Sequence, residues 1–296
     1  MQGPPKILVT GANGQLGKEI KQISSLYPHF EFVFLSKEDL PIHHLEMVRD
    51  YLKMHKPSYL VNCAAYTAVD RAEQEKDLAM QVNGEAPGVL AAICNENDCR
   101  FIHISTDYVF DGTAAEPYKE DAITNPQSVY GLSKLEGEKQ ALQFNPNAII
   151  IRTSWVYSEF GKNFVKTMMK LMREKDEINV VSDQLGSPTY AADLAEVIMK
   201  IIQKLHMNAS SVMTPGGIYH FSNDGIISWY DFAVEIKKMI GSDCKVNPIP
   251  TSAYPTPAKR PGYSVLDKTK IQNQFGIRLK DWKNSLAVCV EKIKTL

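Results

Sequence analysis

Residues 6–17 of the chain read KILVTGANGQLG and decide the fold. The apolar, β-branched run at residues 6–10 predicts a strand, and Leu16, Ile20 and Ile23 then follow at helical spacing. Glycines spaced G-x-x-G-x-x-G lie between these two predicted elements. They permit a tight turn, the approach of backbone amides to a pyrophosphate, and close packing of helix on strand. The stretch therefore predicts a dinucleotide site with these binding residues: Gly11, Asn13, Gly14, Gln15, Leu16 and Gly17.

The first half of the chain continues as an alternation of short apolar strands and helices. Further strands are predicted over residues 30–35, 59–65, 101–105 and 148–153, and helices over 15–25, 44–55, 83–95 and 128–143. Short, nearly continuous apolar strands between helices are typical of a parallel sheet covered on both faces. Right-handed crossovers make such a sheet doubly wound. We expect an α/β fold with a Rossmann-like doubly wound parallel sheet, built mainly from residues 1–155.

The second half of the chain is less regular. Helices are predicted over residues 163–175, 191–205 and 229–240, strands over 178–182 and 218–222, and two helices at the end of the chain. A polar stretch occupies residues 206–217, and five prolines between residues 248 and 261 predict an extended loop. We expect residues 156–296 to form mainly a smaller C-terminal α/β domain that binds substrate, with some later segments returning to the sheet.

Composition excludes several classes of protein. Lysine and arginine number 33 against 34 aspartates and glutamates, which gives no electrostatic basis for binding nucleic acid or an anionic membrane. The apolar runs are far shorter than the roughly 20 residues that span a bilayer, and no apolar signal region follows Met1. The five cysteines form no C-x-x-C pair, so neither a disulfide framework nor a zinc site is expected. A cytoplasmic enzyme is the expectation.

The end of the second predicted strand bears on the choice of cofactor. A site for NAD usually has Asp or Glu there, to accept a hydrogen bond from the ribose 2′-hydroxyl. This chain has Ser36 and Lys37, a hydroxyl and a cation that suit a 2′-phosphate. We expect NADPH to be preferred, with NADH as the alternative cofactor; Lys37 as a solvated surface lysine is the competing interpretation.

Two further clusters carry groups suited to the reduction of a ketone. The fourth predicted strand ends at Thr106, and ligands of open α/β sheets bind beyond the carboxyl ends of strands. Tyr130 and Lys134 are four residues apart in a predicted helix and share a face. The lysine is expected to lower the phenol pKa from about 10 toward the working pH, so that the phenol can protonate an alkoxide as it forms. With Thr106 holding the carbonyl oxygen, we interpret these three residues as catalytic and a nicotinamide cofactor as the hydride source.

Six motifs extend over nearly the whole chain: residues 61–73 (VNCAAYTAVDRAE), 105–112 (STDYVFDG), 129–134 (VYGLSK), 152–157 (RTSWVY), 183–189 (DQLGSPT) and 260–266 (RPGYSVL). Together they resemble the extended branch of the short-chain dehydrogenase/reductase family, and within it the dTDP-4-dehydrorhamnose reductases. Because the motifs are so widely spread, this resemblance is much more specific than a shared nucleotide-binding fold.

The resemblance implies reduction of a dTDP-linked 4-keto-6-deoxy sugar to dTDP-L-rhamnose, a precursor of surface polysaccharide. It implies that Tyr130 donates the proton, that Lys134 also binds the nicotinamide ribose and that Thr106 orients the sugar carbonyl. The implied substrate-binding residues are Thr106, Asp107, Trp155 and Arg260, with Arg260 on the diphosphate, and the residues implied to line the cofactor are Ala64, Ala65, Tyr66 and Thr67.

Some members of this family bind Mg²⁺ through glutamates at a dimer interface. Glu19 fits the first of these positions, but Ala192 occupies the second, with Asp193 beside it. Because a divalent cation needs several oxygen ligands, we predict no metal. A homodimer is compatible with the sequence.

Two alternatives stay open. Another extended-branch enzyme, such as a 4-epimerase, would use the same tyrosine and lysine, but it would return its hydride and consume no NADPH. A binding protein similar to the regulatory subunit of methionine adenosyltransferase would reduce no ketone. The presence of Thr106, Tyr130 and Lys134 argues against a purely regulatory role.

Overall fold

The computed structural model describes residues 3–207 and 216–295 of the chain. Its largest element is a six-stranded sheet in which all neighbouring strands are parallel. In order across the sheet, the strands are β10 (Gly217–His220), β5 (Ile149–Thr153), β4 (Arg100–Thr106), β3 (Tyr59–Asn62), β1 (Lys6–Thr10) and β2 (Glu31–Leu35). The edge strand β10 comes from beyond residue 155 and pairs with β5.

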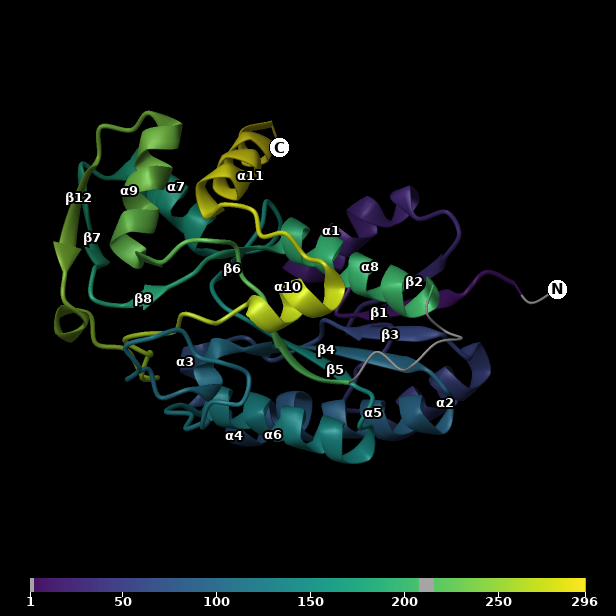
Figure 1. Ribbon diagram of the computed structural model, residues 1–296. Coiled ribbons are helices and arrows are strands. Elements are labelled where there is room, and N and C mark those ends of the chain that lie inside the picture. Colours follow the sequence, from purple (N-terminus) through teal and green to yellow (C-terminus); the bar gives the residue numbers. More distant parts are fainter. Residues whose placement is uncertain (1–2, 208–215, 296) are drawn as a thin grey trace.

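Helices cover both faces of this sheet (Figure 1). One face carries α1 (Gln15–Ile23), α8 (Ala191–Met207) and α10 (Thr269–Phe275), and the other carries α2 (Leu45–His55), α5 (Ala86–Glu96) and α6 (Val129–Phe144). Side chains alternate along each strand, so Ile7 and Val9 join the core beneath α1 and α8 while Leu8 joins the core beneath α5. The predicted α/β fold with a doubly wound parallel sheet is confirmed.

The strand order reverses at β1, because β2 lies on one side of it and β3, β4 and β5 follow on the other. Ligands of open α/β sheets bind at the carboxyl ends of the strands beside such a reversal. The glycine turn follows β1 at this edge, and residues 63–67 follow β3. An added Cβ on Gly11, whose φ is +67°, would lie 2.6 Å from the Ala64 nitrogen. Only glycine therefore allows these two segments to lie so close together.

A second group of elements packs around its own apolar core beside the sheet. It contains the parallel pair β7 (Glu177–Val181) and β12 (Lys245–Ile249), with α7 (Phe164–Glu174), α9 (Trp229–Ile240) and α11 (Trp282–Thr295). The prediction of an extended loop over the prolines is wrong at its start, because Pro248 lies within β12. In a two-stranded sheet β12 has one free edge, and a proline without an amide hydrogen is tolerated on such an edge.

Short elements complete the fold, and two of them differ from the predicted boundaries. Strand β3 ends at Asn62 instead of Ala65, because the Ala64 amide donates to the Asn62 side chain at 3.2 Å and leaves the strand pairing. The helix predicted from residue 83 begins as an α-helix only at Ala86, the start of α5, because a π-helical turn, η2 (Gln81–Glu85), occupies the preceding residues. The remaining short elements are η1 (Ser24–Leu26), α3 (Val69–Ala72), α4 (Lys76–Met80), η3 (Asp107–Val109), β6 (Val156–Tyr157), β8 (Leu185–Gly186), β9 (Thr189–Tyr190), β11 (Ile227–Ser228) and η4 (Thr251–Ala253).

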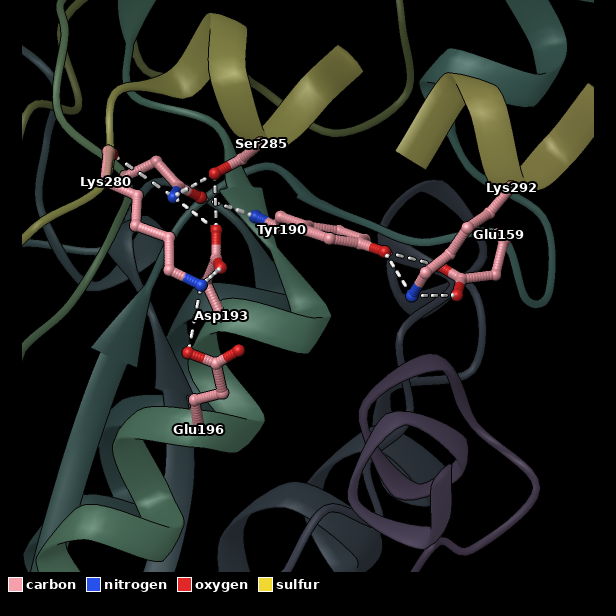
Figure 2. A network of polar contacts seen from close by, with 8 residues as sticks. Glu159, Tyr190, Asp193, Glu196, Lys280, Ser285 and Lys292 are labelled. Atoms are coloured by element: carbon pink, nitrogen blue, oxygen red, sulfur yellow. Dashed lines mark hydrogen bonds and ion pairs between the residues drawn. The ribbon is translucent and has the colours of Figure 1, made fainter. Parts of the chain in front are cut away.

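Figure 2 shows the polar network that fixes α11 to the rest of the chain. Asp193, in the first turn of α8, accepts a hydrogen bond from Ser285 of α11 at 2.5 Å. Glu159 accepts hydrogen bonds from Tyr190 at 2.9 Å and from Lys292 of α11 at 2.8 Å. Both carboxylates are buried, and a buried carboxylate is costly to leave without donors. The network therefore fixes the position of the C-terminal helix.

Residues 206–217 form the polar stretch predicted from the sequence. Helix α8 ends at Met207 and β10 begins at Gly217, and residues 208–215 of the predicted polar stretch lie outside the described residues. Within the part of the chain that the structure describes, no helix combines the length and apolar character needed to cross a membrane.

We predict that Gly11→Ala destabilises the chain more than Gly241→Ala does. Both glycines have a positive φ, +67° and +63°, but an added Cβ would meet neighbouring backbone atoms only at Gly11. The left-handed conformation costs each alanine about 1–2 kcal/mol, and overpacking adds about 1–3 kcal/mol at Gly11 alone. Urea unfolding measures both losses, and equal losses would contradict the close approach of the glycine turn to residue 64.

Candidate active site

The glycine turn leaves the first backbone amides of α1 without a side-chain cap. Gly14 is the N-cap residue, and it has no side chain to accept their hydrogen bonds. Gly17 lets the helix lie against the turn, since an added Cβ would be 2.5 Å from the Gly11 carbonyl oxygen. Uncapped amides and the positive end of the helix dipole favour a phosphate group at this position.

The predicted cofactor residues of this turn point in different directions. Leu16 is buried in the core between α1 and the sheet, and the Gln15 side-chain oxygen accepts a hydrogen bond from Asn163 at 2.8 Å. Asn13 lines a pocket on the outer side of the turn. Leu16 and Gln15 can therefore offer a ligand their backbone amides, whereas Asn13 can offer its side chain.

This pocket, of about 780 Å³, is lined by the glycine turn and by the end of β2. Ser36 belongs to its lining, and Lys37 does not. Two lysines of α1, Lys18 and Lys21, line the pocket instead. Sequence reasoning missed them because it looked for the cation at the end of β2. Their separation of three residues, which places both on one face of the helix, is the signal that could have found them.

Asn83 connects the segment after β3 to α6. Its side chain accepts a hydrogen bond from the Tyr66 amide at 2.8 Å and donates to the Tyr66 carbonyl at 3.0 Å and to Ser133 at 3.1 Å. An added Cβ on Gly137 of α6 would lie 2.0 Å from the Asn83 carbonyl oxygen. Asn83 therefore positions residues 64–67, which are predicted to line the cofactor. Sequence patterns could not identify Asn83, because a lone asparagine in a predicted helix carries no signal.

Helix α6 rests directly on the end of β4. An added Cβ on Gly131 would lie 2.2 Å from the carbonyl oxygen of Tyr108, which follows β4 in η3. The Ser128 hydroxyl caps the helix by accepting a hydrogen bond from the Gly131 amide at 3.1 Å. No larger residue than glycine fits at this contact, so the sequence permits a close approach of the helix to β4.

Both candidate catalytic side chains of α6 reach β4. The Lys134 ammonium nitrogen, Nζ, lies 2.6 Å from the Ile104 carbonyl oxygen and donates to it. Thr106, the last residue of β4, lies close enough to the Tyr130 phenol for its side chain to lower the phenol pKa. The structure thus brings together the three residues that the sequence singled out as catalytic.

Burial dominates the pKa values in this cluster. It raises the pKa of Tyr130 to about 12, while the hydrogen bond with Thr106 lowers it. Burial lowers the pKa of Lys134 to about 8, and the charge of Glu138 acts in the opposite direction. The prediction that Lys134 lowers the pKa of Tyr130 is therefore wrong for this arrangement. Burial is the largest cause and Lys134 is not among the causes, so the phenol is protonated at neutral pH.

Asp107 and the Trp155 ring both lie near Ser264, although the three residues belong to distant parts of the chain. Asp107 is buried, and its Oδ2 atom has no hydrogen-bond partner among the described residues. The Ser264 side chain lies near Asp107 and lowers its pKa. An added Cβ on Gly186 would lie 2.9 Å from the Ser264 hydroxyl and 2.6 Å from the Trp155 ring. An unpaired buried carboxylate oxygen is costly, so this position suits a polar group of a ligand.

Arg260 is paired with a carboxylate. Its Nη1 and Nη2 atoms donate to the two carboxylate oxygens of Asp70 at 3.0 and 2.8 Å. The charges of Arg260 and Asp70 both affect the pKa of Tyr108, which places the pair beside η3. A diphosphate that contacts Arg260, as predicted, would have to share its guanidinium group with the Asp70 carboxylate or displace that carboxylate.

The two acidic residues that were compared with known magnesium ligands are engaged elsewhere. Glu19 is buried and accepts a hydrogen bond from Ser158 at 2.6 Å. Asp193 accepts hydrogen bonds from Ser285 and Lys280 (Figure 2). Over residues 3–207 and 216–295, no three His, Cys, Asp or Glu side chains are grouped so as to hold a metal ion.

Residues 5–295 match the family described as RmlD substrate binding domain. The chain belongs to this family. A dTDP-4-dehydrorhamnose reductase of Aggregatibacter actinomycetemcomitans is 42% identical over 287 residues, which cover 95% of this chain and 97% of the relative. The resemblance seen in the sequence motifs and the expectation of an oxidoreductase are therefore confirmed.

Two solved structures of the same kind of reductase share this fold over nearly their whole length. The enzyme of Clostridium acetobutylicum has a TM-score of 0.91 and 43% identity, covering 98% of this chain and 99% of its own. That of Bacillus anthracis, solved in complex with NADP, has a TM-score of 0.89 and 35% identity, covering 97% and 99%. The agreement extends over both the sheet and the smaller group of elements.

Asp107 gives the stability of the chain a predicted pH dependence. Burial raises the pKa of Asp107 from 3.8 to about 6. The folded chain therefore binds this proton more tightly than the unfolded chain, and the resulting stabilisation, complete below pH ~4, is lost as the pH rises through about 6. Asp107→Asn removes this loss. The free energy of unfolding of the variant, relative to the unchanged chain, should rise by about 2 kcal/mol between pH ~4 and pH ~7 in urea unfolding.

Asp111→Asn is the matched control. Hydrogen bonds from Thr113 lower the pKa of Asp111. The stabilisation of the fold by ionised Asp111 is therefore present above the usual pKa of an aspartate and is lost as the pH falls. The difference between this variant and the unchanged chain should therefore vary with pH in the opposite direction. The same slope for both variants would contradict the burial of Asp107.

Proposed function

We propose that the chain reduces dTDP-4-dehydro-L-rhamnose to dTDP-L-rhamnose with NADPH, by hydride transfer to C4 of the sugar. The observation that carries this proposal is the convergence of Thr106, Tyr130 and Lys134 at the carboxyl end of β4. The relatives that are about 40% identical to the chain, and that bear this activity in their names, support it.

NADPH fits the residues around the glycine turn. Gly11 and Gly17 keep the turn free of side chains, and the uncapped amides of α1 suit its pyrophosphate. Residues 64–67 would lie along the cofactor, and Lys134 would bind the nicotinamide ribose. When bound, NADPH supplies the hydride, while the protein supplies the proton and the orientation of the reacting groups.

Tyr130 would donate the proton to the sugar oxygen O4. Because its pKa is raised, the phenol keeps its proton at neutral pH until negative charge develops on the carbonyl oxygen. The Thr106 side chain lies beside the same phenol, so both hydroxyls can converge on one oxygen and stabilise its charge. Lys134 lies one turn further along α6, anchored to the Ile104 carbonyl.

The sugar nucleotide would lie between a cofactor domain, mainly residues 1–155, and a substrate domain, mainly residues 156–296. Asp107 would accept a hydrogen bond from the sugar with its free Oδ2 atom. Trp155 would contact the same ligand from the second domain; its φ of +50° is rare for a residue with a side chain and marks a constrained position. Arg260 would contact the diphosphate, which suits a guanidinium group.

We predict a higher kcat/KM with NADPH than with NADH. Lys18, Lys21 and Ser36 line the pocket beside the glycine turn, and Ser36 engages the Asp39 carboxylate through its amide at 2.9 Å. Replacing both lysines by alanine should lower kcat/KM for NADPH about tenfold or more and leave that for NADH little changed, as expected for charged hydrogen bonds to a 2′-phosphate. Lys37→Ala tests the lysine that the sequence suggested. Equal kcat/KM values for the two cofactors would contradict the preference.

Tyr130→Phe should abolish most of kcat, by a factor of about 100 to 10,000, because the proton donor is lost while the ring remains. Loss of the nicotinamide absorbance on addition of the keto sugar measures turnover, and fluorescence titration measures NADPH binding, which should be retained. Tyr51→Phe, on α2, is the control and should behave as the unchanged chain does. A Tyr130→Phe variant with full turnover would refute the assignment.

A further inference from the structure

Trp155 lies where the chain leaves the large sheet and enters the second group of elements. It comes two residues after the end of β5 and directly before β6. Its φ of +50° is in the left-handed region, which a residue with a side chain rarely adopts. Such a conformation persists only where neighbouring contacts hold it, and it is common at ligand sites. The contacts that hold Trp155 therefore bear on the proposed site.

Hydrogen bonds fix the backbone around Trp155 to one segment of the second group. The Ser154 hydroxyl donates to the Ser187 carbonyl at 2.6 Å. The Thr189 amide donates to the Trp155 carbonyl at 3.3 Å, and the Thr153 hydroxyl donates to the Thr189 hydroxyl at 2.9 Å. These bonds hold the peptide groups on both sides of Trp155. They leave the side-chain torsions of the indole free, so other contacts must fix its orientation.

Two neighbours confine the Trp155 indole. The ring of Trp229 is stacked on it, with 3.6 Å between the ring centroids and 11° between the ring planes. Gly186 is the second neighbour, since an added Cβ there would lie 2.6 Å from the Trp155 ring. A side chain at residue 186 would therefore displace the indole. The stacked ring and the bare glycine together define one place for it.

These two neighbours belong to one small structural unit. Gly186 of β8 is the register partner of Ile227 in β11, and Trp229 follows β11 directly as the first residue of α9. The start of α9 is fixed by reciprocal bonds. The Asp231 amide donates to the Ser228 hydroxyl at 3.1 Å, and the Ser228 amide donates to the Asp231 carboxylate at 2.9 Å. Trp229 is thus held at a defined place relative to Gly186.

Trp229 is itself supported from the apolar core of the second group. The ring of Phe164 in α7 lies 4.7 Å from the ring of Trp229, and that of Phe232 lies 6.5 Å from it, centroid to centroid. Phe232 is fully buried in this core. A continuous series of aromatic contacts therefore connects the core, through Trp229, to Trp155.

The confined indole borders the proposed site. The position of an added Cβ on Gly186, which touches the Trp155 ring, also lies 2.9 Å from the Ser264 hydroxyl. Ser264 is in turn a neighbour of Asp107, whose buried Oδ2 atom has no hydrogen-bond partner among the described residues. Trp155 and Trp229 are only partly buried. A ligand that bonds to Asp107 can therefore also contact the indole.

We propose that Trp229 is a positioning residue that holds the Trp155 indole in one orientation before the sugar nucleotide binds. An indole held in this way loses little conformational freedom on binding, so Trp229 strengthens binding and leaves the chemical step unchanged. The effect on the sugar nucleotide rests on the proposed function. The effect of Trp229 on the orientation of Trp155 needs no substrate.

Fluorine NMR of protein labelled with 5-fluorotryptophan tests the positioning without substrate. The chain has three tryptophans, and Trp155→Phe identifies the signal of Trp155. Trp229→Leu keeps apolar bulk but removes the flat ring, so the Trp155 signal should broaden or divide as the indole samples several orientations. In Trp229→Phe the signal should stay single and sharp. An unaltered Trp155 signal in Trp229→Leu would overturn the proposal, whatever reaction the protein catalyses.

Steady-state kinetics with dTDP-4-dehydro-L-rhamnose test the effect on binding. Trp229→Leu should raise KM for the keto sugar about threefold to tenfold, the range expected for the loss of one aromatic pair. It should leave kcat and the Kd of NADPH within about twofold of the unchanged protein, because neither depends on the indole. Trp229→Phe should restore most of the loss. An unchanged KM, a loss confined to kcat, or no rescue by phenylalanine would overturn the role of Trp229.

Trp282→Leu is the matched control for a structural effect. Trp282 packs in the same apolar core, where its ring contacts Phe232 at 5.9 Å and, among the described residues, not the stacked pair. The substitution should reduce stability without altering the Trp155 signal or KM. An equal rise of KM in Trp282→Leu would contradict a specific role of Trp229. If the unchanged protein reduces no keto sugar, the proposed function fails, while the NMR experiment still decides the positioning.

Discussion

The contact between α6 and the carboxyl end of β4 is the constraint on which the site depends. Gly131 allows the helix to touch the backbone of Tyr108, and Lys134 of the helix donates to the Ile104 carbonyl of β4. A buried polar group of this kind is costly to leave without a partner, so the helix cannot slide along the strand without a large loss of stability. Tyr130, one turn earlier, is thereby held against Thr106.

The same constraint connects the two halves of the binding region. Asn83 bonds both to Ser133 of α6 and to the backbone of Tyr66, so the segment after β3 is positioned by the helix that carries Tyr130 and Lys134, the proposed catalytic side chains. That segment in turn touches Gly11 of the glycine turn. A displacement of α6 would therefore disturb the cofactor side and the substrate side together.

The sequence predicted what depends on local pattern and missed what depends on tertiary contact. The glycine turn, the alternation of strands and helices, and the spacing of Tyr130 and Lys134 are local, and each was found. The two lysines of α1 lie beside the end of β2 only because distant segments pack together. The same is true of the contact between Lys134 and His103. The pKa of Tyr130 was mispredicted for the same reason, because burial, the largest cause of its rise, depends on that packing. Pro248 lies within a strand because that strand has a free edge, and the spacing of prolines in the sequence cannot show which strands have one.

The proposed function requires that the site deliver both hydride and proton to a ketone and retain neither. The most direct test is to incubate the protein with dTDP-4-dehydro-L-rhamnose and NADPH, and to measure both the oxidised cofactor and the sugar product. The account predicts that one NADPH is oxidised for each sugar that is reduced. Conversion of the sugar without net loss of NADPH would indicate an epimerase and contradict the account, as would the absence of any reaction despite bound NADPH.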